Sequence, residues 1–384
     1  MKSQKIYAQV ILLNVLFATW TFCQIDPAID ARLEKRSHTF QNLTIPYRLY
    51  VPDNYAAKNS YPLLLFLHGA RWAGTDNVTQ LDNELALYWI DSTRQTIHPC
   101  FVVYPQIPAG KSWEYASGQI NDLPASPELA TANDIITSLL NEFTIDRRRL
   151  YVCGKSIGAL GVYGMLARYP NRYSAAIPAA GYYLYCSLTD LSNHSLWLFH
   201  NKDDNVVSAG QSRHVVTELE NIGGSFLLTH CNFKTSACDT LSRETIDSAI
   251  AGGATQIYSE FDDAGHQLEP NVVSTYGLYD WVMAQSKTES RIEDKDRYMN
   301  FRLCNYPNPF NNGTTITFTL DRDMPVRLRV WSVKGELVST LMEGWLESGH
   351  HQYFWRAIHV TSGIYLVELS SQANVQLDRC TLLK

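Results

Sequence analysis

The sequence has no dense stripe of lysine and arginine: its 32 basic residues are outnumbered by 38 acidic ones, and the formal net charge is −6. A protein that binds nucleic acid through phosphates needs clustered positive charge, so this balance argues against nucleic acid as a partner. Charged residues make up only 18% of the chain and apolar residues 45%, which is typical of a globular protein with a sizeable core. The chain also has no internal repeat and no long low-complexity tract, which excludes a repeat architecture.

No C-x-x-C pair and no histidine–cysteine cluster has metal-ligand spacing, so we predict no structural zinc. We also expect no other metal and no cofactor. The eight cysteines can instead form disulfides in an oxidising compartment. Cys231 and Cys238 lie close together in a loop-like stretch and are one candidate pair. Cys304 and Cys380 bracket the C-terminal segment and are a second candidate pair. The cysteines expected to remain buried thiols, because they lie at probable strands, are Cys100 and Cys153.

The apolar run at the N-terminus, Val10–Trp20, is too short to span a membrane comfortably. It follows Lys2 and Lys5, and this order is typical of a signal peptide that is cleaved after Cys23. A membrane anchor and lipidation of Cys23 are the alternatives. We predict that residues 1–23 are a signal peptide and that the protein is secreted or at the cell surface, without stable membrane insertion.

From about residue 40, short apolar runs alternate with segments of helical periodicity. Strands that alternate with helices predict a mostly parallel sheet covered by helices on both faces, which is an α/β fold. The predicted strands are 47–51, 63–67, 101–104, 150–153, 175–178, 196–200 and 257–261, and the predicted helices are 127–143, 159–168, 209–222 and 272–284.

The composition changes near residue 286, where a polar and charged segment without apolar periodicity begins. Short strand-like runs separated by turn residues follow it and favour a small β-sandwich. We therefore predict an α/β domain at 24–288, a linker at 289–303 and a β-sandwich at 304–384. The predicted strands of the sandwich are 315–320, 326–331, 351–355 and 363–369.

Ser156 lies between Gly154 and Gly158, directly after an apolar strand and directly before a predicted helix. At such a strained turn the flanking residues must be small, and the serine hydroxyl is pushed clear of the backbone. The helix that follows offers free N–H groups and a positive dipole end to a developing oxyanion. Ser156 is therefore the candidate nucleophile.

A serine nucleophile needs a base and an acid that orients the base. Asp204 follows the predicted strand 196–200 and is the candidate acid, with its neighbour Asp203 as the alternative. His266 follows the last predicted strand of the domain, and Gly265 before it allows a sharp bend back toward the serine. His266 is therefore the candidate base.

An oxyanion needs two N–H donors, one of which commonly comes from the residue after the nucleophile, here Ile157. The second is expected from Ala70 or Arg71, because the strand at 63–67 runs into a glycine turn. Arg71, Gln106 and Trp113 lie in loops at the same predicted edge and are the candidate substrate-binding residues. Packing within the loops is the alternative role for them.

Several ordered motifs over about residues 40–285 resemble the esterase branch of the α/β-hydrolases. They are similar to the predicted peptidase and phospholipase–carboxylesterase group, and to secreted feruloyl and polyhydroxyalkanoate-type esterases. The resemblance implies Ser156 as nucleophile, Asp204 as acid and His266 as base. Arg71 departs from the pattern, since a small residue is common there. The motifs are Tyr61–Leu63, His68–Ala70, Gly74–Asn77, Tyr104–Gln106 with Trp113, Ile145–Asp146, Arg149–Val152, Gly154–Gly161, Tyr169–Tyr173, His200–Val207, Gly265–His266 and Tyr279–Trp281.

The segment 304–384 resembles the C-terminal sorting domain of the type IX (Por) secretion system, which implies contact with secretion machinery. A carbohydrate-binding sandwich is the alternative. The motifs that carry the resemblance are Tyr306–Phe310, Thr314–Ile316, Val333–Val338, Ser362–Tyr365 and Leu382–Lys384.

Together these resemblances imply a secreted serine carboxylesterase that acts on an external polymer. Acetyl or feruloyl esters of plant cell-wall polysaccharide are the first expectation. Polyester hydrolysis and then peptide hydrolysis follow as alternatives. A hydrolase-like binding protein without catalysis is the alternative of a different class.

Overall fold

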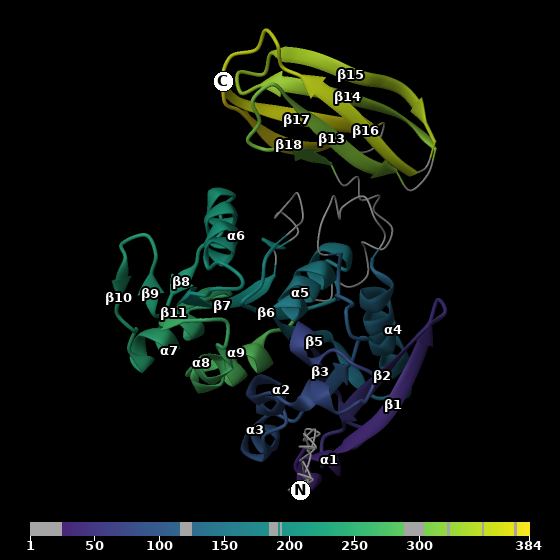
Figure 1. Cartoon of the computed structure of the whole chain (residues 1–384), viewed down its shortest axis with the longest axis vertical. Coiled ribbons are helices and arrows are strands. Elements are labelled where there is room, and N and C mark those ends of the chain that lie inside the picture. The colour runs from purple at the N-terminus through teal and green to yellow at the C-terminus, as the bar shows by residue number, and fades with distance from the viewer. Residues whose placement is uncertain are drawn as a thin grey trace, which may run out of the picture.

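The computed structural model describes residues 25–115, 125–183, 191–192, 194–287, 303–320, 323–347, 349–371 and 375–384 (Figure 1). The predicted signal peptide and all but the last residue of the predicted linker lie outside the described residues. Among the described residues, no helix combines the length and the apolar character that crossing a bilayer requires.

A nine-stranded sheet forms the centre of the N-terminal part, in the order β1-β2-β4-β3-β5-β6-β7-β11-β8. The pairs β1–β2 and β2–β4 are antiparallel, and the other neighbours are parallel. The predicted mostly parallel sheet is thus confirmed. Its strands are β1 Leu33–Phe40, β2 Leu43–Tyr50, β3 Tyr61–Leu67, β4 Phe101–Pro105, β5 Ile145–Lys155, β6 Ala175–Ala179, β7 Ser195–Asp203, β8 Leu227–Leu228 and β11 Gln256–Ala264.

Helices cover both faces of this sheet. The helices are α1 Pro27–Asp30, α2 Glu84–Tyr88, α3 Ser92–Ile97, α4 Pro127–Glu142, α5 Ile157–Arg168, α6 Gly210–Asn221, α7 Arg243–Ala251, α8 Glu269–Ser274 and α9 Leu278–Ala284, with the 3-10 turns η1 Ala70–Trp72 and η2 Thr79–Leu81. Helices α4, α5 and α6 pack on one core, and α2, α8 and α9 pack on the other (Figure 1). Leu65 on β3 belongs to the first core, whereas its neighbours Leu64 and Phe66 belong to the second. This is why β3 reads as an unbroken apolar run.

The prediction of one continuous closing helix at 272–284 is wrong. The structure divides this segment between α8 and α9, and Gly277 between them has φ 76°, a left-handed conformation that favours glycine. Strand β1 and helices α2, α3 and α7 were not expected. Each of the three helices is short. Strand β1 lies at the edge of the sheet, and most of its side chains are exposed or only partly buried, so it has no run of apolar residues.

The C-terminal part is a β-sandwich, as predicted. One sheet has the order β12-β13-β16 and the other β15-β14-β17-β18, and all neighbours are antiparallel. Phe318, Leu328 and Val367 are fully buried between the sheets. The strands are β12 Cys304–Tyr306, β13 Gly313–Leu320, β14 Met324–Ser332, β15 Leu337–Leu346, β16 Gly349–Arg356, β17 Gly363–Ser371 and β18 Val375–Leu382.

One of the two predicted cysteine pairs exists in the structure. A disulfide joins Cys231 and Cys238 across the small hairpin of β9 Cys231–Asn232 and β10 Ala237–Cys238. The pairing of Cys304 with Cys380 is wrong: both are buried thiols, which lie on β12 of one sheet and β18 of the other. The cysteines confirmed as buried thiols are Cys100 and Cys153.

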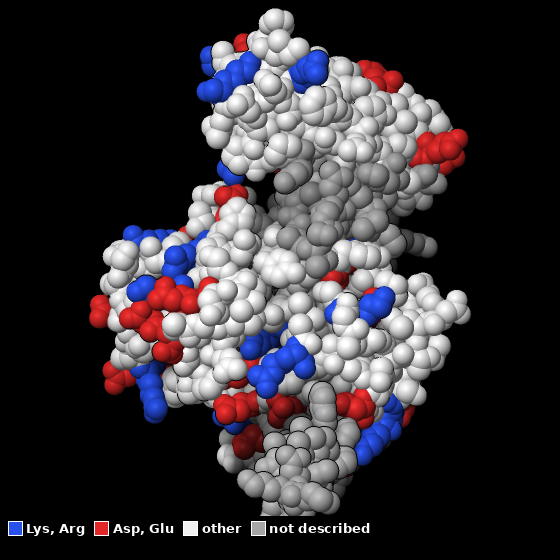
Figure 2. All heavy atoms as spheres, viewed as in Figure 1, with Lys and Arg blue, Asp and Glu red and all other residues white. Residues whose placement is uncertain are grey.

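Lys and Arg alternate with Asp and Glu on the face of the molecule seen in Figure 2. Among the described residues of that face, the basic side chains form no continuous patch. This distribution agrees with the small negative net charge of the sequence.

Asp378 on β18 gives the sandwich an expected pH dependence. Its carboxylate accepts a hydrogen bond of 2.6 Å from the Asn305 side chain, and burial raises the pKa of this carboxyl from 3.8 to about 6. The folded state therefore holds the proton more tightly than the unfolded state, so stability falls as the pH rises through about 4 to 6. We expect the melting temperature of the sandwich to drop by a few degrees over this range.

The Asp378→Asn variant has no carboxyl group at this position to ionise, so the melting temperature of its sandwich should not show this drop. Calorimetry of the full chain between about pH 4.5 and about pH 8 checks the expectation. An equal pH dependence in Asp378→Asn and the parent chain would contradict it.

Candidate active site

Ser156 occupies a sharp turn between the end of β5 and the start of α5. Its backbone has φ 57° and ψ −121°, a region that non-glycine residues rarely adopt. The Ser156 N–H donates to the carbonyl of Ala179 at 2.9 Å, which helps to hold this conformation. Strained backbone of this kind is concentrated at functional sites, because the surrounding structure must enforce it.

The glycines on either side of Ser156 are required by close packing. A Cβ atom on Gly158 would lie 1.9 Å from the carbonyl oxygen of Leu67 at the end of β3. A Cβ atom on Gly154 would lie 2.4 Å from the carbonyl oxygen of Gly158. The first turn of α5 therefore sits directly on the end of β3, and only glycine permits this approach.

Gly158→Ala should consequently destabilise the protein by several kcal/mol, because the new methyl group meets backbone that cannot move aside. Gly210→Ala is the matched control. Gly210 also starts a helix, and its Cβ would meet only the hydroxyl of Ser208 at 3.2 Å. Urea unfolding of the two variants checks the expectation, and equal unfolding free energies would contradict it.

Asp204 and His266 are joined by a short hydrogen bond. The Nδ1–H of His266 donates to Oδ2 of Asp204 at 2.6 Å, while Oδ1 of Asp204 accepts from the N–H groups of Val206 and Val207. Burial alone raises the pKa of the Asp204 carboxyl, but these hydrogen bonds outweigh it and hold the pKa below its usual value. Asp203, the alternative acid, is exposed at the end of β7.

The other ring nitrogen of His266 is left with a lone pair. Since Nδ1 carries the proton donated to Asp204, Nε2 of the neutral ring is unprotonated. Nε2 is buried and has no hydrogen-bond partner among the described residues. Gly265, with φ 85°, supplies the bend that was predicted before His266. The ring can therefore accept a proton at this nitrogen.

His200 supports this pair, a role that the sequence did not indicate. It is fully buried, and its ring lies 2.7 Å from the hydroxyl of Ser212 and 2.8 Å from the carbonyl of Val207. Burial lowers the pKa of His200, which keeps the ring neutral. It therefore fixes the turn whose N–H groups hold Asp204. The signals that could have suggested it are its place in the motif His200–Val207 and its four-residue spacing from Asp204.

The two proposed oxyanion donors lie on neighbouring elements. Ala70 is the first residue of η1, which follows β3 after two intervening residues, and Ile157 is the first residue of α5. Neither donates its N–H to another group among the described residues. Both donors belong to segments that the glycine contacts hold together, because Gly158 packs on the end of β3.

Two of the three predicted substrate-binding side chains face inward, so the structure argues against direct substrate contact. Gln106 is 0% exposed, accepts from the N–H of Asn77 at 2.7 Å and donates to Asp76 at 2.9 Å. Trp113 is 0% exposed, and its indole N–H donates to the carbonyl of His68 at 2.9 Å. Both residues hold loops in place, which was the alternative role.

Arg71 is exposed on η1, and its guanidinium lies 5.1 Å from the centre of the Trp72 ring. It therefore remains a candidate for substrate contact.

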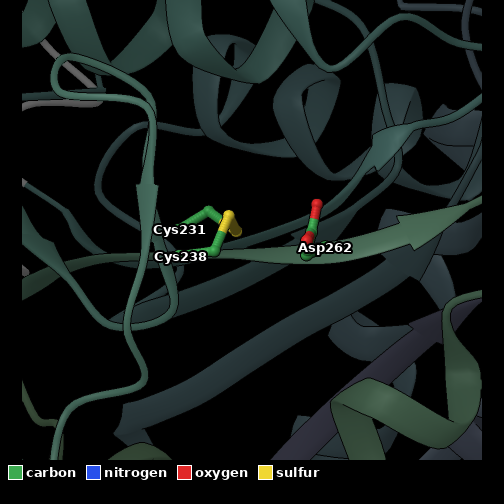
Figure 3. A group of neighbouring side chains, drawn as sticks. All are labelled: Cys231, Cys238 and Asp262. Carbon is green, nitrogen blue, oxygen red and sulfur yellow. A yellow bond between two sulfur atoms is a disulfide. The ribbon is translucent and has the colours of Figure 1, made fainter.

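One group of side chains has the proximity of a metal site. The sulfurs of Cys231 and Cys238 and a carboxylate oxygen of Asp262 lie within 4.8 Å of one another (Figure 3). The sulfurs are bonded to each other, so neither is a thiolate ligand.

Two family models match the chain. Residues 305–381 match the secretion system C-terminal sorting domain, and residues 37–267 match the model described as "Putative esterase".

The chain is also similar to curated acetylxylan esterases. Acetylxylan esterase A of Aspergillus ficuum is 23% identical over 197 residues, which cover 48% of this chain and 61% of that protein. The bifunctional acetylxylan esterase/xylanase XynS20E of Neocallimastix patriciarum is 29% identical over 134 residues, 35% of this chain and 17% of that protein. The chain thus spans less than two thirds of the length of these relatives.

Among solved structures, that of a thermostable esterase is 27% identical, with a TM-score of 0.53 over 67% of this chain and 64% of that one. The expected α/β-hydrolase fold with a C-terminal sandwich is confirmed. Because the esterase model matches more than half of the chain, the protein belongs to this esterase family.

Proposed function

We propose that this protein is an exported hydrolase of carboxylic esters, and that it removes acetyl or feruloyl groups from plant polysaccharide. The observation that carries the proposal is the pair of Asp204 and His266. Nε2 of His266 is buried, has no hydrogen-bond partner among the described residues, and belongs to the edge of the sheet where β5 ends at Ser156. The names of the curated relatives, acetylxylan esterases, support acetylated xylan as the first substrate to test.

In the proposed mechanism, Oγ of Ser156 attacks the ester carbonyl while Nε2 of His266 takes the hydroxyl proton. Asp204 keeps the ring in the tautomer that leaves Nε2 free and stabilises the imidazolium that forms. The N–H groups of Ala70 and Ile157 stabilise the oxyanion. His266 then protonates the leaving alkoxide, and water, deprotonated by His266, releases the acid from the acyl-enzyme.

Export is part of the proposal. The sorting-domain match at 305–381 supports passage through a type IX secretion system. We propose residues 1–23 as the signal peptide, 24–288 as the catalytic domain, 289–303 as the linker and 304–384 as the sorting domain that contacts the secretion machinery. Loss of the C-terminal domain from the secreted protein would support sorting, whereas binding of the chain to polysaccharide through it would favour the alternative.

The direct test measures product release by the purified full chain from acetylated xylan, methyl ferulate and p-nitrophenyl acetate, with a polyester film and a peptide as alternatives. We expect acetate from xylan or ferulate from its ester at rates far above those in buffer. Rates equal to buffer on every ester would overturn the proposal and favour a binding protein without catalysis.

A further inference from the structure

We propose that Lys155 is a positioning residue whose buried ammonium group fixes three segments relative to one another. These segments are the turn at Ser156 (the nucleophile turn), the loop that carries His266 (the histidine loop) and η1, which begins at Ala70 (the oxyanion loop). The inference rests on the proposed ester hydrolysis. It adds a residue and a partner, Glu269, to that site.

The first link joins the nucleophile to the base. Lys155 is the last residue of β5 and directly precedes Ser156, whereas Glu269 is the first residue of α8, three residues after His266. The Lys155 Nζ lies 2.6 Å from Oε1 of Glu269, and the two side chains are only 5% and 10% exposed. A charge-assisted contact this short fixes the distance between the two segments.

The second link reaches the oxyanion loop. The Lys155 Nζ lies 5.2 Å from the centre of the Trp72 ring, within the range of a cation–π contact. Trp72 is the last residue of η1, which begins at Ala70, the proposed oxyanion donor. A Cβ atom on Gly69 would lie 3.4 Å from the carbonyl oxygen of Lys155, so the loop before η1 also passes close to the end of β5. One ammonium group therefore contacts two of the three loops and belongs to the third.

The ion pair is not arranged for stability alone. Moving two charges out of water is costly, and well-packed apolar residues of similar volume are often as stable or more stable. The second carboxylate oxygen of Glu269 is buried and has no hydrogen-bond partner among the described residues, which adds to this cost. A role in fixing the positions of the segments around Ser156 and His266 therefore explains this buried pair better than a role in stability does.

The expected consequence is a loss of turnover without a matching loss of stability. Displacing a reacting group by about 1 Å lowers the rate by roughly 100-fold. Lys155→Met with Glu269→Leu replaces the directional contact by non-directional apolar packing and leaves no charge unpaired.

The experiment compares kcat, KM and thermal unfolding of this double variant and the parent chain with p-nitrophenyl acetate. We expect kcat to fall by about 10- to 100-fold and KM to change by less than about twofold, with a melting temperature at or above that of the parent.

The matched control is Arg168→Met with Glu114→Leu. It removes another buried pair, whose side chains are 7% and 0% exposed, at the far end of α5. That control should keep kcat within about twofold of the parent.

A stable double variant with the kcat of the parent would overturn the inference, because the ion pair would then only satisfy its own charges. If the double variant fails to fold, Glu269→Gln provides the test: its neutral amide weakens the contact, and we expect kcat to fall by about fivefold or more. An unchanged kcat in Glu269→Gln would equally overturn the inference. Failure of the proposed function is distinguishable from both, since the parent chain itself would then hydrolyse no ester.

Discussion

Replacing Ser156 by alanine is expected to lower kcat for p-nitrophenyl acetate by about 10⁴- to 10⁶-fold, since the oxyanion donors and substrate binding alone retain only a small part of the catalysis. The fold should survive, because the Ser156 hydroxyl makes no hydrogen bond to any described residue and the N–H bond to Ala179 is kept. Steady-state kinetics and thermal unfolding on the same samples check both expectations.

Covalent labelling gives an independent measurement of the same residue. A fluorophosphonate reacts with an activated serine, so the intact mass of the parent chain should increase by one adduct and that of Ser156→Ala should not. A labelled Ser156→Ala variant, or one that retains more than about a tenth of the kcat, would place the nucleophile elsewhere.

Asp204→Asn should have the second largest effect, a fall in kcat of about 10³- to 10⁴-fold. The asparagine amide offers a donor where Asp204 now accepts from His266 at 2.6 Å, so the ring would turn to the tautomer that protonates Nε2. In the proposed mechanism, the hydroxyl of Ser156 would then meet a donor at Nε2 and could not lose its proton to the ring.

Asp203→Asn is the control that the chain itself provides. Asp203 directly precedes Asp204 and is exposed, so kcat of the Asp203→Asn variant should stay within about twofold of the parent value. If instead Asp203→Asn loses activity and Asp204→Asn keeps it, the acid has been assigned to the wrong neighbour. Comparing kcat of the two variants under identical conditions decides between them.

The parts of the site that the sequence predicts are those in which local signals agree. Ser156 stands between glycines at the junction of an apolar strand and a helix, and each of those features is local. Asp204 and His266 were predicted from their order along the chain and from the strand ends before them. The hydrogen bond between them follows from the parallel sheet, because its strands end at one edge.

What the sequence could not predict is which way side chains face after packing. Gln106 and Trp113 lie in the expected loops, but the loops fold so that both side chains point into the protein. The contact of Lys155 with Glu269 joins residues 114 positions apart, and it depends on how α8 packs beside β5. Tertiary placement of this kind leaves no periodic signal in the chain.

The positive φ of Ser156 has a consequence for how this protein balances stability against activity. Such a conformation costs a non-glycine residue about 1 to 3 kcal/mol, whereas glycine adopts it freely. The Ser156 hydroxyl makes no hydrogen bond among the described residues, so Ser156→Gly should raise the melting temperature of the domain while it abolishes turnover. Selection or engineering for heat resistance alone would then remove the proposed nucleophile, so a screen for more stable variants has to be run with substrate present.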